Sequence, residues 1–261
     1  MKKLDSPEKV RQKIRKGLWT KPTSGLAPGV AQANLVILDR GVAFDFLLFC
    51  QRNPKPCPIL EVLEPGQIEP RRTAPGADIR TDLPLYRIWQ KGKLKQEVTE
   101  IRSFFNPDLV TFLLGCSFSF EEALIHAGIP IRNIEEAKNV SMYITNRKCD
   151  PAGPFSAPLV VTMRPIRDDL VARAVQITSR YASVHGAPIH IGNEKRIGIR
   201  DLGRPEFGDP VTIRKGETPV FWACGVTSTL GALSAKLDLV ITHAPGHMFI
   251  SDVNNETLSV I

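Results

Sequence analysis

The sequence of 261 residues has no apolar run long enough to cross a membrane. Its longest runs, Leu47–Cys50 and Leu109–Leu114, fall far short of the roughly 18 residues that a membrane-spanning helix needs. The first residues, Met1–Asp5, lead directly into a charged segment, without the apolar core of a signal peptide. We therefore expect a cytoplasmic protein with no membrane partner.

Cysteine is scarce, and the motifs that bind nucleotides or metals are missing. The five cysteines are an odd number and form no C-x-x-C pair, which favours reduced thiols over disulfides in a chain of this size. Neither G-x-x-x-x-G-K-[ST] nor G-x-G-x-x-G occurs, and no set of zinc ligands accompanies the histidines. We expect neither a metal nor a cofactor.

The net charge of +7 does not indicate nucleic acid as a partner. Seven of the 34 basic residues lie in the first 16 positions, where they fit the solvated face of a helix, and the others are scattered. Arginine pairs bidentately with carboxylates, so we expect a small anionic substrate instead. Whether the protein forms a homo-oligomer stays open.

The chain is organised around a strand, a tight turn and a helix between residues 108 and 128. Leu109–Leu114 is a continuous apolar run of strand length, typical of a strand buried on both faces. Ser119 and Glu122 have the spacing of a capping box, which predicts that the helix starts at Ser119.

The turn in this stretch places Cys116 and Ser117 at the N-terminus of the helix. Partial positive charge and unpaired backbone donors at such an end favour an anion or a thiolate. Cys116 is then either a nucleophile with a lowered pKa or an inert buried thiol, and both interpretations stay open.

The remaining patterns predict an α/β fold. Strands are expected at 33–38, 59–63, 86–89, 96–101, 109–114, 158–163, 187–191, 209–213, 219–224 and 239–242, and helices at 6–16, 42–50, 119–127 and 168–177. Residues 1–148 with 217–261 would form a larger three-layer α/β domain with a mixed sheet. Residues 149–216 would form a smaller two-layer α/β subdomain inserted in the C-terminal half. No internal repeat is visible.

Three apolar strands end in polar turns that contain glycine, at Leu114–Ser119, Ala223–Ser228 and Ile241–His247. In open α/β sheets, ligands bind outside the carboxyl ends of strands. If the three strands are parallel neighbours, one crevice collects Cys116, Ser117, Cys224, Thr227, His243 and His247. Ser117, Ser119, Cys224 and Thr227 are then candidates for contact with the substrate.

Two histidines and two arginines complete the candidate site. Pro245–Gly246 excludes a helix between His243 and His247, so these residues do not form a zincin-type pair. They either transfer protons near neutral pH or stabilise a turn. Arg164 follows a strand and Arg180 a helix, so each either binds a substrate carboxylate or caps backbone carbonyls.

Long motifs in the sequence resemble the D-glutamate cyclase family, whose bacterial members are named hydro-lyases. The resemblance covers roughly residues 6 to 252 and rests on RNPKPCP, DIRTDLP, LVTFLLGCSFSFEEAL, AGIP, NRKCDPAGPFSAPLVVTMRP, QITSRYASVHGAPIHIG, PVFWACGVT and ITHAPGHM. It implies a carbon–oxygen lyase that acts on a small amino or carboxylic acid, with D-glutamate losing water to give 5-oxo-D-proline. No catalytic residue is transferred from the family.

For that reaction we expect His243 and His247 to transfer protons and the backbone at Cys116 and Ser117 to hold the oxyanion. Arg180, with Arg164 second, would bind the α-carboxylate, and a thioester through Cys116 is the alternative route. Two other functions stay open. One is a non-catalytic protein that binds a carboxylate or 5-oxoproline and supports a neighbouring enzyme. The other is an ordinary hydratase of hydroxy acids.

Overall fold

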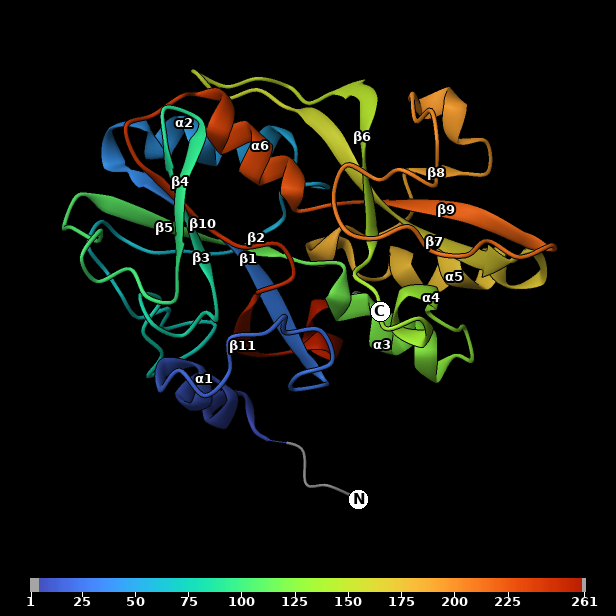
Figure 1. The fold of residues 1–261 in the computed structure, drawn as a ribbon, viewed down its shortest axis with the longest axis horizontal. Helices are drawn as coiled ribbons and strands as arrows, with labels where there is room; N and C mark the ends of the chain where they lie inside the picture. The colour runs from blue at the N-terminus through green and yellow to red at the C-terminus, as the bar shows by residue number, and fades with distance from the viewer. Residues whose placement is uncertain (1–4, 260–261) are drawn as a thin grey trace.

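The computed structural model describes residues 5–259 and contains two β-sheets that lie side by side (Figure 1). The first sheet has seven strands in the order β2-β5-β1-β10-β3-β4, with β11 also paired to β1. Its strands are β1 (Val30–Asp39), β2 (Ile59–Val62), β3 (Tyr86–Gln90), β4 (Lys93–Val98), β5 (Leu109–Gly115), β10 (Val240–His243) and β11 (Phe249–Asn254).

The second sheet has four strands in the order β6-β7-β9-β8. They are β6 (Ser141–Lys148), β7 (Pro158–Arg167), β8 (His190–Ile191) and β9 (Glu217–Ala223). The α-helices in the described residues are α1 (Pro7–Arg15), α2 (Arg40–Arg52), α3 (Phe118–His126), α4 (Arg132–Glu135), α5 (Val171–Ser179) and α6 (Val226–Ser234). None of these helices meets the length and hydropathy that a membrane span requires.

The predicted three-layer domain with a mixed sheet, and the two-layer subdomain beside it, are wrong. Every paired strand in both sheets is antiparallel to its neighbour. The apolar run that suggested a parallel strand is β5, which is buried throughout because it lies inside the first sheet, between β2 and β1. Burial on both faces thus arises here from helices and loops that cover an antiparallel sheet.

Two predicted strands also differ from the structure. Residues 209–213 form no strand, and the backbone N–H of Thr212 donates instead to the Glu136 carboxylate. The strand expected at 187–191 is reduced to β8. Residues 149–216 supply β7 and β8, whereas β6 and β9 of the same sheet come from outside that segment. A division of the chain into domains at the predicted boundaries stays a prediction.

The structure contains a repeat of connectivity that the sequence does not display. The order β1-α2-β2-β5-α3-β6 in the first half matches β7-α5-β8-β9-α6-β10 in the second, with the hairpin β3-β4 and the short helix α4 inserted in the first half. The strand orders β2-β5-β1-β10 and β8-β9-β7-β6 correspond in the same way. Strand β6 pairs with β7, and β10 pairs with β1, so each half contributes its last strand to the sheet of the other half.

The two halves also share one hydrophobic core. Its aromatic centre contains Phe46 of α2, Phe112 of β5 and Phe155 from the loop before β7. The ring of Phe46 meets the other two edge-on, at centroid distances of 4.9 and 5.1 Å. Helix α6 packs against α2 at Gly231, where a Cβ would lie 2.7 Å from the ring of Phe49. The exchanged strands and the shared core therefore join the halves into one packed unit.

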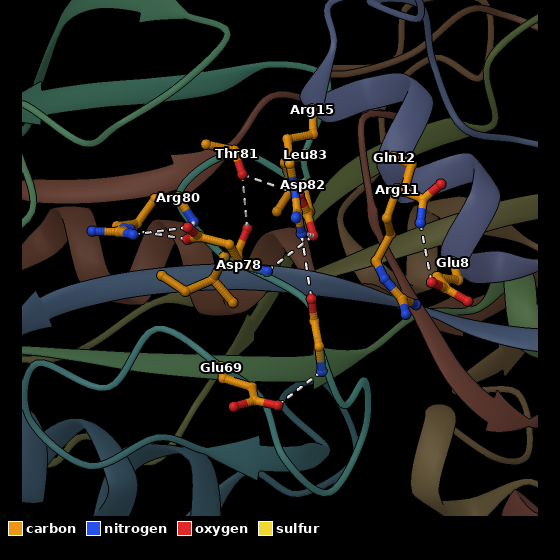
Figure 2. Close-up of polar contacts among 12 residues, drawn as sticks. Glu8, Arg11, Gln12, Arg15, Glu69, Asp78, Arg80, Thr81, Asp82 and Leu83 are labelled. Carbon is orange, nitrogen blue, oxygen red and sulfur yellow. Dashed lines mark hydrogen bonds and ion pairs between the residues drawn. The ribbon is translucent and has the colours of Figure 1, made fainter.

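Helix α1 is held by a buried carboxylate in the loop between β2 and β3 (Figure 2). Asp82 is fully buried and accepts hydrogen bonds from Nε and Nη2 of Arg15, at 2.7 and 2.6 Å. It also accepts from the Thr81 hydroxyl and from the backbone N–H of Asp78. Asp78 in turn pairs with Arg80, whose hydrogen bonds and charge lower the pKa of Asp78 against the opposing effect of burial. This network orders a long loop that has few regular elements.

We expect the Arg15→Ala substitution to lower the free energy of unfolding by about 2–3 kcal/mol, because it leaves a buried carboxylate without its charged partner. Urea unfolding at neutral pH measures the effect. Arg40→Ala is the matched control, since Arg40 pairs with Asp108 at the surface and both side chains are more than half exposed. That substitution should change stability by less than about 0.5 kcal/mol. Equal effects of the two substitutions would contradict the assigned role of Asp82.

Candidate active site

The three predicted turns meet at one small cavity between the two halves of the molecule. Residues that follow β5 and β9, together with the turn after β10, form its wall. Its lining includes Asn34, Cys116, Ser117, Phe118, Thr162, Cys224, Gly225, Val226, His243 and Gly246. The three strands are not the parallel neighbours that we expected, since β9 belongs to the other sheet. The turns meet because the two halves are interleaved.

Two helix N-termini approach this cavity with the same local geometry. Ser117 precedes α3 with φ −62° and ψ −16°, and Gly225 precedes α6 with φ −62° and ψ −17°. The predicted capping box is wrong, because α3 begins at Phe118 and Ser119 lies inside it. The partial positive charges of two helix N-termini thus lie at one wall, where they favour a carboxylate.

The cysteines at these two helix starts are thiols. Cys116 and Cys224 are buried, and burial raises the pKa of Cys116 to about 12 and that of Cys224 to about 11. A backbone N–H two residues later, from Phe118 or Val226, acts on each sulfur in the opposite direction but does not outweigh burial. At neutral pH the site therefore favours a role for these turns in holding an anion over nucleophilic attack by Cys116.

His243 is a buried neutral imidazole. The backbone N–H of Leu35 lies 3.2 Å from its Nδ1, closer than the Leu35 carbonyl oxygen at 3.4 Å. The shorter contact assigns Nδ1 as the acceptor, so the neutral ring carries its proton on Nε2. Burial lowers the pKa of His243 to about 4. At physiological pH the ring is therefore suited to donate a hydrogen bond from Nε2.

His247 has the opposite tautomer. Its Nδ1 lies 2.9 Å from the Pro245 carbonyl oxygen, to which it donates, and Nε2 is left as an acceptor. The ring is half-buried and does not line the cavity, although it is close enough for its charge to lower the pKa of His243. The two histidines thus differ in role: one presents a donor and the other a base.

Arg164 is completely engaged inside the protein. Its guanidinium forms an ion pair with Glu121 of α3, with Nε–Oε1 at 3.0 Å, and donates to the hydroxyls of Thr162 and Ser117 at 3.0 and 3.1 Å. The rings of Phe120 and Trp222 lie 5.3 and 5.6 Å from it. This geometry favours an indirect role, in which Arg164 orients Ser117, and direct contact with a substrate stays a prediction.

Three other predicted residues lie away from the cavity. Thr227 is buried in α6, where its hydroxyl accepts the backbone N–H of Val160 and joins α6 to β7. Ser119 and Arg180 line a separate cleft on another side of α3. Their contact with a substrate in the cavity stays a prediction without support from this arrangement.

Asn34 and Thr162 are residues of the cavity that the sequence reasoning missed. They occupy matching positions, since Asn34 lies in β1 opposite Leu114 and Thr162 lies in β7 opposite Trp222. Asn34 donates to the Gly115 carbonyl and sits against Gly225, where a Cβ would lie 2.2 Å from its side-chain nitrogen. A polar residue within each apolar strand was the signal that could have identified them.

The cavity has a volume of about 30 Å³, which suits a carboxylate group rather than a whole amino acid. A groove of about 340 Å³ shares Asn139 and Gly246 with it and is lined by Pro22, Ser24, Gly25, Asn133, Ile134, Ala137 and Lys138. The remainder of a substrate would fit there. In residues 5–259 no group of three or more His, Cys, Asp or Glu side chains is placed to hold a metal ion.

Comparison with known proteins identifies the family. Residues 110–252 match the family model described as D-glutamate cyclase. A protein of Syntrophobacter fumaroxidans named "Putative hydro-lyase" is 69% identical over 99% of both chains. Similar proteins of Geobacillus kaustophilus and Bacillus subtilis are 60% and 57% identical over 98% of this chain and 97% and 100% of theirs. The chain belongs to the D-glutamate cyclase family.

A solved structure that aligns with this chain shows only low similarity to it. The nitrogen repressor-like protein MJ0159 from Methanococcus jannaschii aligns over 94% of this chain and 98% of its own, with a TM-score of 0.40 and 7% identity. A likeness of that size supports no conclusion on fold or function.

The burial of His243 and of His185, whose pKa burial also lowers to about 4, predicts a dependence of stability on pH. Above about pH 6.5 both rings are neutral whether the chain is folded or unfolded. As the pH falls from about 6.5 towards 4, the unfolded chain binds protons that the folded protein excludes. The free energy of unfolding should therefore decrease by roughly 1.4 kcal/mol per pH unit for each histidine.

Urea unfolding at several pH values between 4.5 and 7 measures this slope. The His243→Gln variant should lose the contribution of one histidine while other titrating groups still act. A variant with the same slope as the wild type would contradict the assignment of His243 as a buried neutral ring.

Proposed function

We propose that this protein is a hydro-lyase of a small amino or carboxylic acid, and that its reaction is the conversion of D-glutamate to 5-oxo-D-proline and water. The observation that carries this proposal is the convergence of two helix N-termini and a neutral histidine on one cavity of carboxylate size. Such a cavity suits the side-chain carboxylate that must react in this cyclisation. The family name supports the choice of substrate.

In the proposed reaction the γ-carboxylate enters the cavity and the rest of the substrate occupies the adjoining groove. The partial positive charges at the starts of α3 and α6 stabilise the oxygens of the tetrahedral intermediate, and Nε2–H of His243 donates to one of them. His247 directly follows Gly246, which lines both the cavity and the groove, and in this proposal its Nε2 accepts a proton from the α-ammonium. Loss of that proton frees the amine for attack on the γ-carbon. The nitrogen loses two protons in total, and one γ-oxygen gains both and leaves as water.

In this proposal, proximity and donors held in place before binding lower the barrier. The amine and the γ-carbon belong to one molecule, so the site has only to hold the substrate in the folded-back conformation. The donors are held in place before the substrate arrives, since Arg164 fixes Ser117 and Leu35 fixes the ring of His243. Burial of the cavity strengthens each of these interactions relative to water.

We expect the His247→Asn substitution to lower kcat by about 10²–10⁴-fold, because it removes the proposed base. His243→Leu should cost about 10²–10³-fold through the loss of one donor to the oxyanion. Formation of 5-oxo-D-proline from D-glutamate, followed by chiral chromatography, measures both. Cys116→Ala is the control and should keep activity within a few-fold of the wild type, since the thiol is protonated.

Loss of activity in Cys116→Ala, with folding intact, would instead favour the thioester route. Absence of turnover of D-glutamate by the wild-type protein would overturn the proposed substrate. Calorimetry separates the remaining functions: tight binding of 5-oxoproline without turnover indicates a non-catalytic binding protein. Conversion of hydroxy acids but not amino acids indicates an ordinary hydratase.

A further inference from the structure

A second, larger cleft lies between α3, α5 and the C-terminal 3-10 helix η4 (Asn255–Leu258), on a different side of α3 from the cavity. Its volume of about 530 Å³ falls within the usual range for small-molecule sites. The residues that line it are Gly29, Ser119, Glu122, Ala123, His126, Ala127, Arg173, Ile177, Arg180, Tyr181, Asn254, Asn255 and Glu256. The proposed reaction uses none of its charged groups.

Opposite charges are segregated on the walls of this cleft. Arg173 in α5 and Arg180 at its C-terminus are seven residues apart, which places them on the same face of the helix. Glu122 of α3 and Glu256 of η4 provide the negative charge. This distribution suits a ligand with separate positive and negative groups, and the two glutamates disfavour a ligand with negative charge alone.

Two buried oxygens in the lining residues have no hydrogen-bond partner among the described residues: Oγ of Ser119 and Oδ1 of Asn255. Ser119 is 1% exposed and Asn255 7%. The amide nitrogen of Asn255 donates to Glu122 at 3.3 Å, which leaves its oxygen as an acceptor that lacks a donor. Both atoms are closed to solvent, so a ligand in the cleft would meet instead the charged side chains that are open to it, namely those of Glu122, Arg173 and Arg180. An ammonium group would pair with the Glu122 carboxylate, which the amide nitrogen of Asn255 holds in place.

We propose that this cleft binds a free α-amino acid as a zwitterion, at a site separate from the reaction cavity. The ammonium group lies at Glu122, and the carboxylate lies at Arg173 and Arg180. Helix α3 connects the two sites, because its first residues line the cavity and Ser119 and Glu122 line the cleft. An amino acid in the cleft is thus positioned to act on the helix whose N-terminus holds the substrate.

Calorimetric titration of the full-length protein with three related compounds tests the proposal. L-Glutamate carries both groups, glutarate lacks the ammonium, and 4-aminobutyrate lacks the α-carboxylate. L-Glutamate should bind at least tenfold more tightly than either analogue. Equal binding of glutarate, or no binding of L-glutamate, would overturn the proposal.

Substitutions locate the bound molecule. Glu122→Gln should weaken L-glutamate at least tenfold and leave glutarate unchanged or tighter, whereas Arg173→Gln should weaken both. Arg196→Gln, at an exposed arginine of another surface, is the matched control and should change neither. Unaltered binding in Glu122→Gln would refute the placement of the ammonium.

The proposal and the catalytic function can fail separately. His247→Asn removes the proposed base and should retain binding of L-glutamate in the cleft. If that variant loses binding as well, the amino acid occupies the reaction cavity and the second site does not exist.

Discussion

A buried ion pair between Arg164 and Glu121 is the interaction on which the site depends. Both side chains are almost completely buried, and they join β7 of the second half to α3 of the first. Loss of either partner would leave an uncompensated charge in the interior, which is far more costly than loss of a surface pair. The same guanidinium holds Ser117 at the wall of the cavity and contacts the faces of Phe120 and Trp222. The pair thus connects the packing of the two halves to the geometry of the reaction site.

The repeated connectivity explains why the site lies where it does. Each half places a strand, a cysteine and the start of a helix in the same order. Because β6 and β10 are exchanged between the halves, the two helix N-termini face each other. Neither half contains the cavity alone, because Asn34 and Ser117 come from the first and Thr162, Gly225 and His243 from the second. The registers β1–β5 and β7–β9 each contain seven pairs and end at the residue before a cysteine. The two turns differ in chemistry, with Ser117 in one and Gly225 in the other.

Local patterns in the sequence predicted much of the secondary structure and little of its arrangement. The apolar run at β5, the hairpin of β3 and β4 and the helix at α5 follow from periodicity and turn residues. Strand direction does not, because a strand covered on both faces has the same apolar pattern in parallel and antiparallel sheets. The predicted capping box at Ser119 was wrong because the tight turn after Gly115 starts α3 one residue earlier, at Phe118. The Ser119 hydroxyl is therefore buried within the first turn of the helix.

The sequence by itself determined the family and the three polar turns. It also determined which residue types reach the cavity from those turns, because each turn is formed by residues that are consecutive in the chain. The tertiary structure alone decided the charge states of the site's titratable side chains and the residues with which they pair. The thiols of Cys116 and Cys224 stay protonated and His243 stays neutral because distant segments bury them. Arg164 forms an ion pair inside the protein because Glu121, 43 residues away in the sequence, lies beside it. Solvation and pairing depend on what surrounds a group in space, and strand exchange between the halves sets those surroundings.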